Sequence, residues 1–474
     1  MKARELVNLG FPRGEVLKAA QIAAGNAIRD GGMTTRDVRA TLRTLRASPE
    51  QFLDNHLFEP VARALLDLRG RAANREAFIE RDAPAPWQQW GSGLEPESIA
   101  QMRNAARLPV AVAGALMPDA HVGYGLPIGG VLATQNAVIP YAVGVDIACR
   151  MKLTVLDLPL SAIDGQRDRL IGAIETETRF GTGAQFHQPH EHDVMDDEDW
   201  NVSHITTMMK PKAHGQLGTS GSGNHFVEFG TLVLTQPEMG LEAGTYVALL
   251  SHSGSRGAGA RIAQHFSKLA MELHPELPRE LKHLAWLDLD SEPGQQYWAA
   301  MNLMGRYAAA NHAVIHKQIA KHLGAEVLLD IENHHNFAWK ETHDIDGQPV
   351  ELIVHRKGAT PAGEGVLGVI PGSMATPGYV VRGRGVPASL ASASHGAGRA
   401  MSRTQARNTQ TWSAARRFLA ERNVTLISAG LDEVPFAYKD IDEVMSQQRD
   451  LVDVIARFDP RIVKMAPEGE RPED

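Results

Sequence analysis

The sequence predicts an α+β fold, in which mixed β-sheets are flanked by helices and preceded by a small helical module at the N-terminus. Three observations predict it. Apolar residues recur at helical spacing through residues 1–83, runs typical of strands begin at about Leu108, and helical stretches lie between those runs. The chain of 474 residues is 43% hydrophobic and 22% charged, close to the average for folded globular proteins.

Residues 1–83 have the pattern of short helices and carry an excess of positive charge. In MTTRDVRATLRTLR, Thr34 and Asp37 have the spacing of a capping box. The apolar residues that follow at helical spacing are Val38, Leu42 and Leu45. This stretch has 14 Lys and Arg against 11 Asp and Glu, a balance of +3, which leaves −11 for the remainder of a chain with a total of −8. The helical module is therefore the basic part of the chain.

A change of composition follows this module. The segment RDAPAPWQQWGSG contains Pro84 and Pro86, which cannot continue a helix. We therefore expect a linker over residues 84–107 and one large domain over residues 108–465. The polar residues at 466–474 predict a disordered tail.

Strand patterns are clear in three segments of the large domain. MKLTVLDL alternates apolar and polar residues from Met151, as a half-buried strand does. The nearly continuous apolar runs at 244–250 and 326–331 are typical of buried strands. A helical stretch at 260–274 lies between them, so we expect a mixed core whose functional loops follow strands.

Composition argues against several classes of protein. The first residues, MKARELVNLGFPRG, lack the apolar core of a signal peptide, and no apolar run reaches the length of a membrane span. With one cysteine, the chain cannot form an internal disulfide, which suits a reducing compartment. We therefore expect a cytoplasmic protein with no membrane partner. The net charge of −8 argues against non-specific coating of nucleic acid, which relies on clustered Lys and Arg.

The single cysteine, Cys149, lies in VGVDIACRM three positions after Asp146. Two interpretations are open, because a free cysteine packs like a small hydrophobe whereas a thiolate binds metal. Histidines in segments rich in glycine, serine or asparagine favour the metal: His225, His252, His334, His335 and His395. Thiolate, carboxylate and imidazole together suit a borderline divalent ion such as Mn²⁺, Zn²⁺ or Co²⁺.

Several glycine-rich loops indicate phosphate binding. GTSGSGNH, HSGSRGAG, PGSM and SHGAGR combine glycines, which let backbone approach a ligand, with hydroxyls and arginines that bind phosphate oxygens. None of them matches a Walker loop or a Rossmann fingerprint. Phosphate binding beside a divalent metal and an extra histidine indicates metal-assisted phosphoryl or nucleotidyl transfer.

These motifs together resemble the RtcB family of GTP-dependent RNA ligases. In the family's order, the chain has MPDAHVGYGLPIGG, VGVDIACRM, GSGNHFVEFG, HSGSRGAG, HHNFAW, HRKGAT, IPGSM, SHGAGRAMSR, AYKDIDEVM and a VK near the C-terminus. The resemblance implies an RtcB-like fold over residues 108–465, with mixed sheets around a metal and GTP cleft. It does not account for residues 1–83.

The resemblance also implies an activity. Family members join RNA ending in a 2′,3′-cyclic phosphate or 3′-phosphate to RNA with a 5′-hydroxyl, in RNA repair or tRNA splicing. They use GTP and two Mn²⁺ ions and pass through a histidine-guanylate intermediate. RNA and GTP are thus the expected partners, with an activating protein as a further one.

Residue by residue, the resemblance assigns three sets of positions. The two-metal ligands are Asp146, Cys149, His225, His252 and His335, with Cys149 as the bridge. His395 matches the histidine that takes GMP from GTP, and Asp119 matches the carboxylate that orients it. The guanylate contacts are Asn224, Glu228, Ser373, Tyr438 and Lys464.

The chain departs from the family pattern beside the cysteine. Where the family has DIGCGM, Ala148 and Arg150 replace both glycines, and PGSM is followed by Ala375 and Thr376. Arg150 either points into the pocket, where it adds charge beside the metals, or points to solvent and changes little. A divergent bacterial-type paralogue that repairs cleaved RNA fits these departures.

Two other functions are compatible with the same residues. One is a metal-dependent cyclic phosphodiesterase or phosphatase that never uses GTP, and the other is an idle RNA-binding protein on the same fold. The module at 1–83 is expected to be a docking or dimer-stabilising element, and its +3 balance leaves RNA binding as the alternative.

Overall fold

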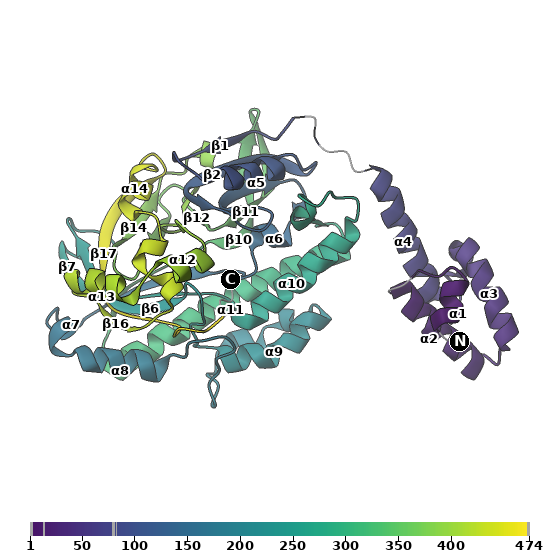
Figure 1. The fold of residues 1–474 in the computed structure, drawn as a ribbon, viewed down its shortest axis with the longest axis horizontal. Helices are drawn as coiled ribbons and strands as arrows, with labels where there is room; N and C mark the ends of the chain where they lie inside the picture. The colour runs from purple at the N-terminus through teal and green to yellow at the C-terminus, as the bar shows by residue number, and fades with distance from the viewer. Residues whose placement is uncertain (1–2, 13–14, 78–80, 82, 472–474) are drawn as a thin grey trace. The chain divides into compact units, whose positions relative to one another are not determined.

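The structure of the protein is a computed structural model that describes residues 3–12, 15–77, 81 and 83–471. The chain forms two compact units (Figure 1). The smaller unit is Met1–Ile79 with Leu273–Leu277, and the larger unit is Glu80–Glu272 with Pro278–Asp474. Among the described residues, no helix combines the length and the apolar character that a membrane crossing requires.

The smaller unit is helical, as its apolar spacing predicts. Its elements are α1 (Ala3–Asn8), α2 (Glu15–Arg29), α3 (Thr35–Ala47), the short 3₁₀ turn η1 (Pro49–Phe52) and α4 (Glu59–Ala77). The capping box is confirmed, because the Thr34 hydroxyl accepts a hydrogen bond from the Asp37 N–H at 3.2 Å and the Asp37 carboxylate accepts from the Thr34 N–H at 3.3 Å. The predicted apolar positions of α3 are fully buried: Val38, Leu42 and Leu45.

The stretch at 84–107, expected to be a linker, contains two elements of the larger unit. β1 (Trp87–Gln89) pairs in parallel with β2 (Ala111–His121), and α5 (Pro96–Ala106) packs against β2. The prolines before β1 do exclude a helix, but the extended backbone that they allow forms the edge strand of a sheet. Most of this stretch is therefore part of the folded larger unit.

The first main sheet of the larger unit has five strands in the order β1-β2-β3-β11-β10. The strands not yet placed are β3 (Ile128–Thr134), β10 (Asn336–Ile345) and β11 (Gln348–Lys357). Two small ribbons accompany the main sheets, namely β4 (Ala137–Val138) with β8 (Leu287–Asp288) and β12 (Ala359–Pro361) with β15 (Ser392–Ser394).

The second main sheet has eight strands and contains the three strands that the sequence predicts most clearly. Its order is β13-β14-β17-β6-β7-β5-β9, with β16 beside β17. The bounds are β5 (Arg150–Leu156), β6 (Phe226–Leu234), β7 (Gly244–Ser253), β9 (Val327–His334), β13 (Leu367–Ile370), β14 (Gly378–Gly383), β16 (Thr425–Ser428) and β17 (Val452–Met465). The expected strands at Met151, 244–250 and 326–331 are β5, β7 and β9.

Helices cover one face of the second sheet. α8 (Arg167–Glu177) and α11 (Glu292–Leu323) pack against its central strands, and Ile315 of α11 shares a buried cluster with Leu249 of β7. Figure 1 shows these helices and α10 (Arg256–Leu273) along one side of the larger unit. The remaining helices are α6 (Pro140–Val143), α7 (Ala162–Gly165), α9 (His204–Gln216), α12 (Arg403–Thr409), α13 (Trp412–Glu421) and α14 (Ile441–Ser446). The mixed α+β architecture is thus the predicted one.

The register of the second sheet aligns the ends of four strands. His252 of β7 lies opposite Phe226 of β6 on one side and Met151 of β5 on the other. On the far side of β5, Arg150 lies opposite His334 at the end of β9. The residues just before β5 and β6 and just after β9 therefore meet at one edge of the sheet.

Candidate active site

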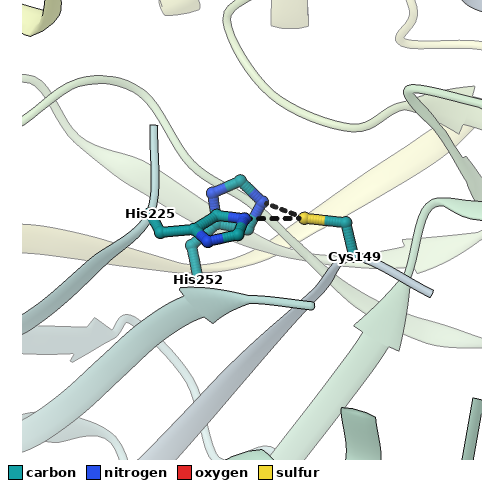
Figure 2. Close-up of side chains that lie close together, drawn as sticks. All are labelled: Cys149, His225 and His252. Carbon is teal, nitrogen blue, oxygen red and sulfur yellow. Dashed lines mark hydrogen bonds between the residues drawn. The ribbon is translucent and has the colours of Figure 1, made fainter. Parts of the chain in front are cut away.

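Four of the predicted metal ligands surround the single cysteine at this edge. The Cys149 sulfur lies 3.0 Å from His252 Nε2 and 3.5 Å from His225 Nε2 (Figure 2). Asp146 Oδ2 lies 3.0 Å from His225 Nε2, and His335 Nε2 lies 3.2 Å from His252 Nε2. All five side chains are buried. The structure therefore brings together the five side chains that the resemblance assigns to metal binding.

Hydrogen bonds on the far side of two rings orient them as ligands. His225 Nδ1 lies 3.0 Å from the Ser220 carbonyl, and His252 Nδ1 lies 3.1 Å from the Asn224 carbonyl. A carbonyl only accepts, so each Nδ1 carries the proton and each Nε2 presents a lone pair to the cluster. Burial also lowers the pKa of His252 to about 3, which keeps this ring neutral.

This donor set fits a bound divalent cation. The ligand atoms of Cys149, His225 and His252 all lie within 4.8 Å of one another. Two imidazole lone pairs, a carboxylate oxygen and a sulfur converge in a buried space, where a cation would satisfy them together. Sulfur, nitrogen and oxygen ligands of this kind suit a borderline divalent ion.

Backbone contacts fix the loop that carries Asp146 and Cys149. The Ala148 N–H donates to the Asn336 carbonyl at 2.7 Å, and the His335 N–H donates to the Cys149 carbonyl at 2.9 Å. Gly254 lets the next loop approach, because a Cβ there would lie 2.2 Å from Asp146 Oδ1. The cysteine loop and the loop after β9 thus hold each other in place.

A second pair, His395 and Asp119, faces the cluster. His395 Nδ1 lies 2.7 Å from Asp119 Oδ2, and the His395 backbone N–H donates to the same oxygen at 3.2 Å. Burial tends to raise the pKa of Asp119, but the hydrogen bond and charge of His395 outweigh it, so the pKa is lowered. The ring of His395 lies 4.9 Å from that of His335, centroid to centroid. The carboxylate therefore holds the proton on Nδ1 and leaves the lone pair of the ring on Nε2.

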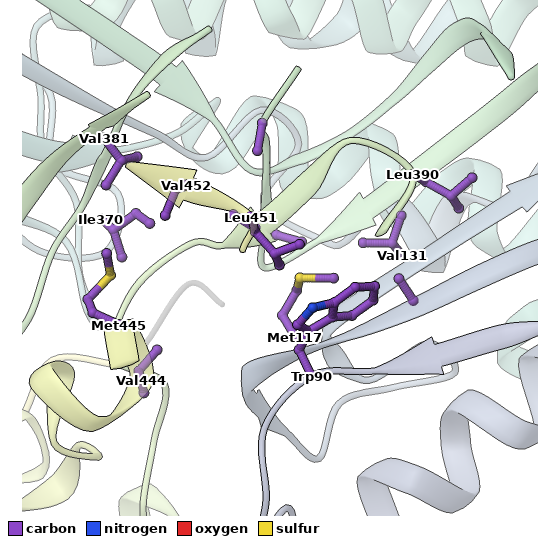
Figure 3. Close-up of a cluster of buried hydrophobic side chains, with 14 of the residues drawn as sticks. Trp90, Met117, Val131, Ile370, Val381, Leu390, Val444, Met445, Leu451 and Val452 are labelled. Atoms are coloured by element: carbon purple, nitrogen blue, oxygen red, sulfur yellow. The ribbon is translucent and has the colours of Figure 1, made fainter. Parts of the chain in front are cut away.

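Apolar packing supports both members of this pair. Met117, two residues before Asp119, and Ala393 and Ala397, on either side of His395, belong to one buried cluster (Figure 3). Gly398 lets the two segments approach, because a Cβ there would lie 2.1 Å from the Asp119 carbonyl oxygen. The hydrophobic cluster thus fixes the distance between the carboxylate and the imidazole.

One cavity of about 310 Å³ connects the metal cluster with His395. Four of the five expected guanylate contacts line it: Asn224, Glu228, Ser373 and Tyr438. The Tyr438 hydroxyl donates to Glu433, and the guanidinium carbon of Arg399 lies 5.3 Å from the centre of the Tyr438 ring. Burial raises the pKa of Glu228 well above its usual range.

Lys464, the fifth expected contact, is oriented differently. Its ammonium lies 3.3 Å from Glu175 and 5.6 Å from the centre of the Phe180 ring, whereas its neighbours Val463 and Met465 line the cavity. Successive residues of a strand point to opposite faces. The structure therefore does not bring the Lys464 side chain together with the other guanylate contacts.

Arg150 points neither into the cavity nor to solvent. Its side chain is 5% exposed and donates to Glu332 at 3.2 Å and to the Gly305 carbonyl of α11 at 3.3 Å. Its charge is therefore compensated on the face of β5 that packs against α11. Ala148, the other departure from the family pattern, has a left-handed backbone with φ of +57°, a conformation that favours glycine.

Two buried cations lie near the site, and neither was among the expected metal ligands or guanylate contacts. Lys357 lines the cavity, and its ammonium donates to the carbonyls of Tyr124 at 2.6 Å and Leu126 at 3.1 Å. Burial lowers the pKa of Lys357 to about 7. Arg256 lies behind the cluster, 3.4 Å from His225 Nδ1. The sequence could have indicated both residues, because each is a basic residue within a segment that resembles the family. Lys357 lies in HRKGAT and Arg256 lies in HSGSRGAG.

Comparisons with known proteins agree with this geometry. The profile of the tRNA-splicing ligase RtcB family matches residues 101–206 and 180–465. The RNA-splicing ligase RtcB of Escherichia coli is 34% identical over 415 residues, which cover 81% of this chain and 97% of that protein. The tRNA-splicing ligase RtcB of Nanoarchaeum equitans is 32% identical over 439 residues, covering 77% and 91%. The RNA-splicing ligase RtcB of Mycobacterium tuberculosis is 35% identical over 428 residues, covering 76% and 98%. A match of this extent, on a chain that assembles the expected cluster, shows that the protein belongs to the RtcB family of tRNA-splicing ligases.

Proposed function

We propose that the protein is a GTP- and Mn²⁺-dependent RNA ligase that joins a 2′,3′-cyclic phosphate or 3′-phosphate end to a 5′-hydroxyl end. The observation that carries this proposal is the His395–Asp119 pair, because His395 lines the same cavity as Cys149, His252 and His335 while Asp119 holds its ring. A metal-dependent hydrolase needs the cluster. It does not need a further imidazole outside the cluster whose Nδ1 proton is held by a carboxylate. The proposed settings are RNA repair and tRNA splicing.

The residues that would hold two Mn²⁺ ions are Asp146, Cys149, His225, His252 and His335. Bound there, the metal would neutralise the charge that develops on phosphate oxygens. The buried imidazoles supply neutral donors and the side chains of Asp146 and Cys149 supply negative ones, so the ligand set itself offsets part of the metal charge.

His395 would perform the first covalent step. Its Nε2 lone pair attacks the α-phosphorus of GTP, an N–P bond forms, and the bond to pyrophosphate breaks. Asp119 holds the Nδ1 proton and stabilises the positive charge that develops on the ring. The side chains available to hold the nucleotide are Asn224, Glu228, Ser373 and Tyr438. Lys464 would join them only by leaving Glu175.

The proposed RNA steps would use the same histidine. The 3′-phosphate attacks the phosphorus on His395, so the N–P bond breaks and the RNA end acquires GMP as a leaving group. The 5′-hydroxyl of the second RNA then attacks the 3′-phosphorus and releases GMP. A 2′,3′-cyclic phosphate is first opened by water to give the 3′-phosphate.

Incubation with α-labelled GTP and Mn²⁺, followed by denaturing gel electrophoresis, tests the proposal. We expect a covalent label on the wild type that is labile in acid and stable in alkali, as a phosphoramidate is. His395→Ala and Cys149→Ala should each lose it. An unlabelled wild type that contains bound metal would refute guanylylation and favour the phosphodiesterase or phosphatase alternative.

A further inference from the structure

Helix α3 of the smaller unit presents a row of arginines. Arg36, Arg39, Arg43 and Arg46 are all exposed, whereas the apolar positions of the same helix are buried. The arginines follow one another at intervals of three, four and three residues. At about 100° and 1.5 Å per residue, they share an arc of about 80° and span about 15 Å of the helix. We call this row the α3 arginine face.

The arginines of this face are exposed to solvent, and the one ion pair described for it, at Arg39, is weak. Arg39 pairs with Glu5 at 3.5 Å, but both side chains are more than 40% exposed, and exposed pairs of this kind contribute well under about 1 kcal/mol. The carboxylate of Asp37 is occupied by the capping box and lies about 100° around the helix from Arg36. Arg46 packs over Gly10, where a Cβ would lie 1.7 Å from its guanidinium.

The composition of the face favours a polyanion over a protein surface. The residues that border the arginines on the solvent side of the helix are Ala40 and Ala47, both exposed and both small. Interfaces between proteins place aromatic or large apolar anchors at their centre, and this face has none among its described residues. Guanidinium groups, in contrast, bind phosphate oxygens in pairs of hydrogen bonds.

The face lies in a part of the chain that the family does not share. The family match begins at residue 101, and α3 ends at Ala47. The catalytic residues all lie in the larger unit. We therefore expect the α3 arginine face to have a role other than the joining reaction itself.

We propose that the α3 arginine face binds the phosphate backbone of the RNA substrate. The proposal rests on the proposed function, because it takes RNA as the substrate. A second contact on the same RNA raises the local concentration of the reacting ends at the active site. Because phosphate contacts carry no sequence information, such binding is tolerant of RNA sequence.

The test uses the full chain with Arg36→Gln, Arg39→Gln and Arg43→Gln combined. Arg46 is left unchanged because it packs over Gly10. The matched control combines Lys18→Gln, Arg29→Gln and Arg63→Gln, which removes three exposed positive charges from α2 and α4 of the same unit. RNA affinity is measured over a range of salt concentrations with a nicked stem-loop that ends in a 3′-phosphate. Circular dichroism checks that both proteins remain folded.

The plot of log K against log salt has a negative slope, and each guanidinium that no longer neutralises a phosphate reduces the magnitude of this slope by about 0.7 to 0.9. We expect the magnitude of the slope to fall by about 2 to 3 in the arginine variant and by less than about 1 in the control. Equal slopes in the variant and the wild type, or equal reductions in variant and control, would overturn the proposal. A change of oligomeric mass in the arginine variant with an unchanged slope would point to a protein partner instead and also overturn it.

If the triple variant unfolds, the single charge reversal Arg43→Glu replaces it in the test. This variant should reduce the magnitude of the slope by about 1. Self-guanylylation without RNA is measured on the same preparations. If the wild type is labelled but the slope of the arginine variant is unchanged, only the proposal that the α3 arginine face binds RNA is overturned. A wild type that is not labelled overturns the proposed function, whatever the slope.

Discussion

The carboxylate of Asp119 lies 2.7 Å from Nδ1 of His395, and the same oxygen also accepts the His395 backbone N–H. Asp119 is fully buried at the end of β2, whereas His395 follows β15. Two segments 276 positions apart are thus joined through one oxygen atom. This contact fixes both the ring orientation and the site of its proton.

Asp119→Asn should therefore slow self-guanylylation by about 100-fold or more, in the range measured when a positioned acid–base group is removed. The amide keeps the size of the side chain but loses its charge, and its NH₂ group favours the wrong tautomer of His395. The measurement is the initial rate of labelling with α-labelled GTP. Metal content should equal that of the wild type, and a rate within about fivefold of the wild type would contradict the role given to Asp119.

Removal of the thiol should abolish metal binding at the cluster. Cys149→Ala removes the atom that lies between His225 and His252, whereas Cys149→Ser retains a weaker oxygen donor. We expect bound manganese, measured by elemental analysis, to fall in the order wild type, serine, alanine. Mn²⁺ at about 100 times its Kd should stabilise the wild type by about 2.7 kcal/mol, which thermal unfolding detects. Equal metal content and equal stabilisation in all three proteins would mean that Cys149 is an inert buried thiol.

The proximity of the cysteine and the histidines could be predicted because these residues lie at the ends of strands. Cys149 precedes β5, His225 precedes β6, and His335 follows β9, each in a segment rich in glycine, serine or asparagine. The sequence does not state that these strands are neighbours. Their adjacency depends on the pairing of β5 with both β7 and β9, which long-range contacts decide.

The orientation of Lys464 could not be predicted in the same way. β17 carries a register shift between Pro460 and Ile462, and an irregularity of this kind changes which residues face the cavity. The orientation of Arg150 could be predicted from the alternation of side chains along β5. Met151, Leu153 and Val155 lie on one apolar face of this strand, so Arg150 lies on the opposite face. Pro84 and Pro86 exclude a helix at their own positions, but proline is also compatible with an edge strand. These two residues alone therefore could not distinguish a linker from β1.

Ala148→Gly should stabilise the protein or leave its stability unchanged. Ala148 has φ of +57°, where a residue with a Cβ is strained by about 1 to 2 kcal/mol. Glycine relieves that strain but loses about 0.5 to 1 kcal/mol through the entropy of the unfolded chain. We therefore expect a gain of up to about 1.5 kcal/mol in the free energy of unfolding, measured in urea.

The matched control for this substitution is Ala420→Gly, at an exposed position of α13. Glycine at a helical position destabilises by about 1 kcal/mol, because it adds entropy to the unfolded chain without relief of strain. A loss of stability in Ala148→Gly as large as that in the control would show that no strain is stored beside Cys149.

Acid should destabilise the protein below about pH 6.5 through buried neutral histidines. Burial lowers the pKa of His355 from 6.5 to about 4. In the fold, its Nε2 accepts the Ile139 N–H at 2.9 Å and its Nδ1 donates to the Leu132 carbonyl at 3.1 Å, so protonation would remove the acceptor. As pH falls from 6.5 to about 4 the unfolded chain binds the proton and the folded chain does not. Stability that is present above about pH 6.5 is therefore lost over that interval, by about 1.4 kcal/mol per pH unit for each such histidine.

His355→Gln isolates this effect from the metal ligands, because the amide oxygen can still accept the Ile139 N–H and has no proton equilibrium in this range. We expect the free energy of unfolding of the wild type to fall more steeply between about pH 7 and pH 5 than that of the variant. Urea titrations at the two pH values, made in the presence of a chelator, provide the comparison. Equal slopes would mean that His355 binds its proton as readily in the fold as in the unfolded chain, and that its two hydrogen bonds do not hold it neutral.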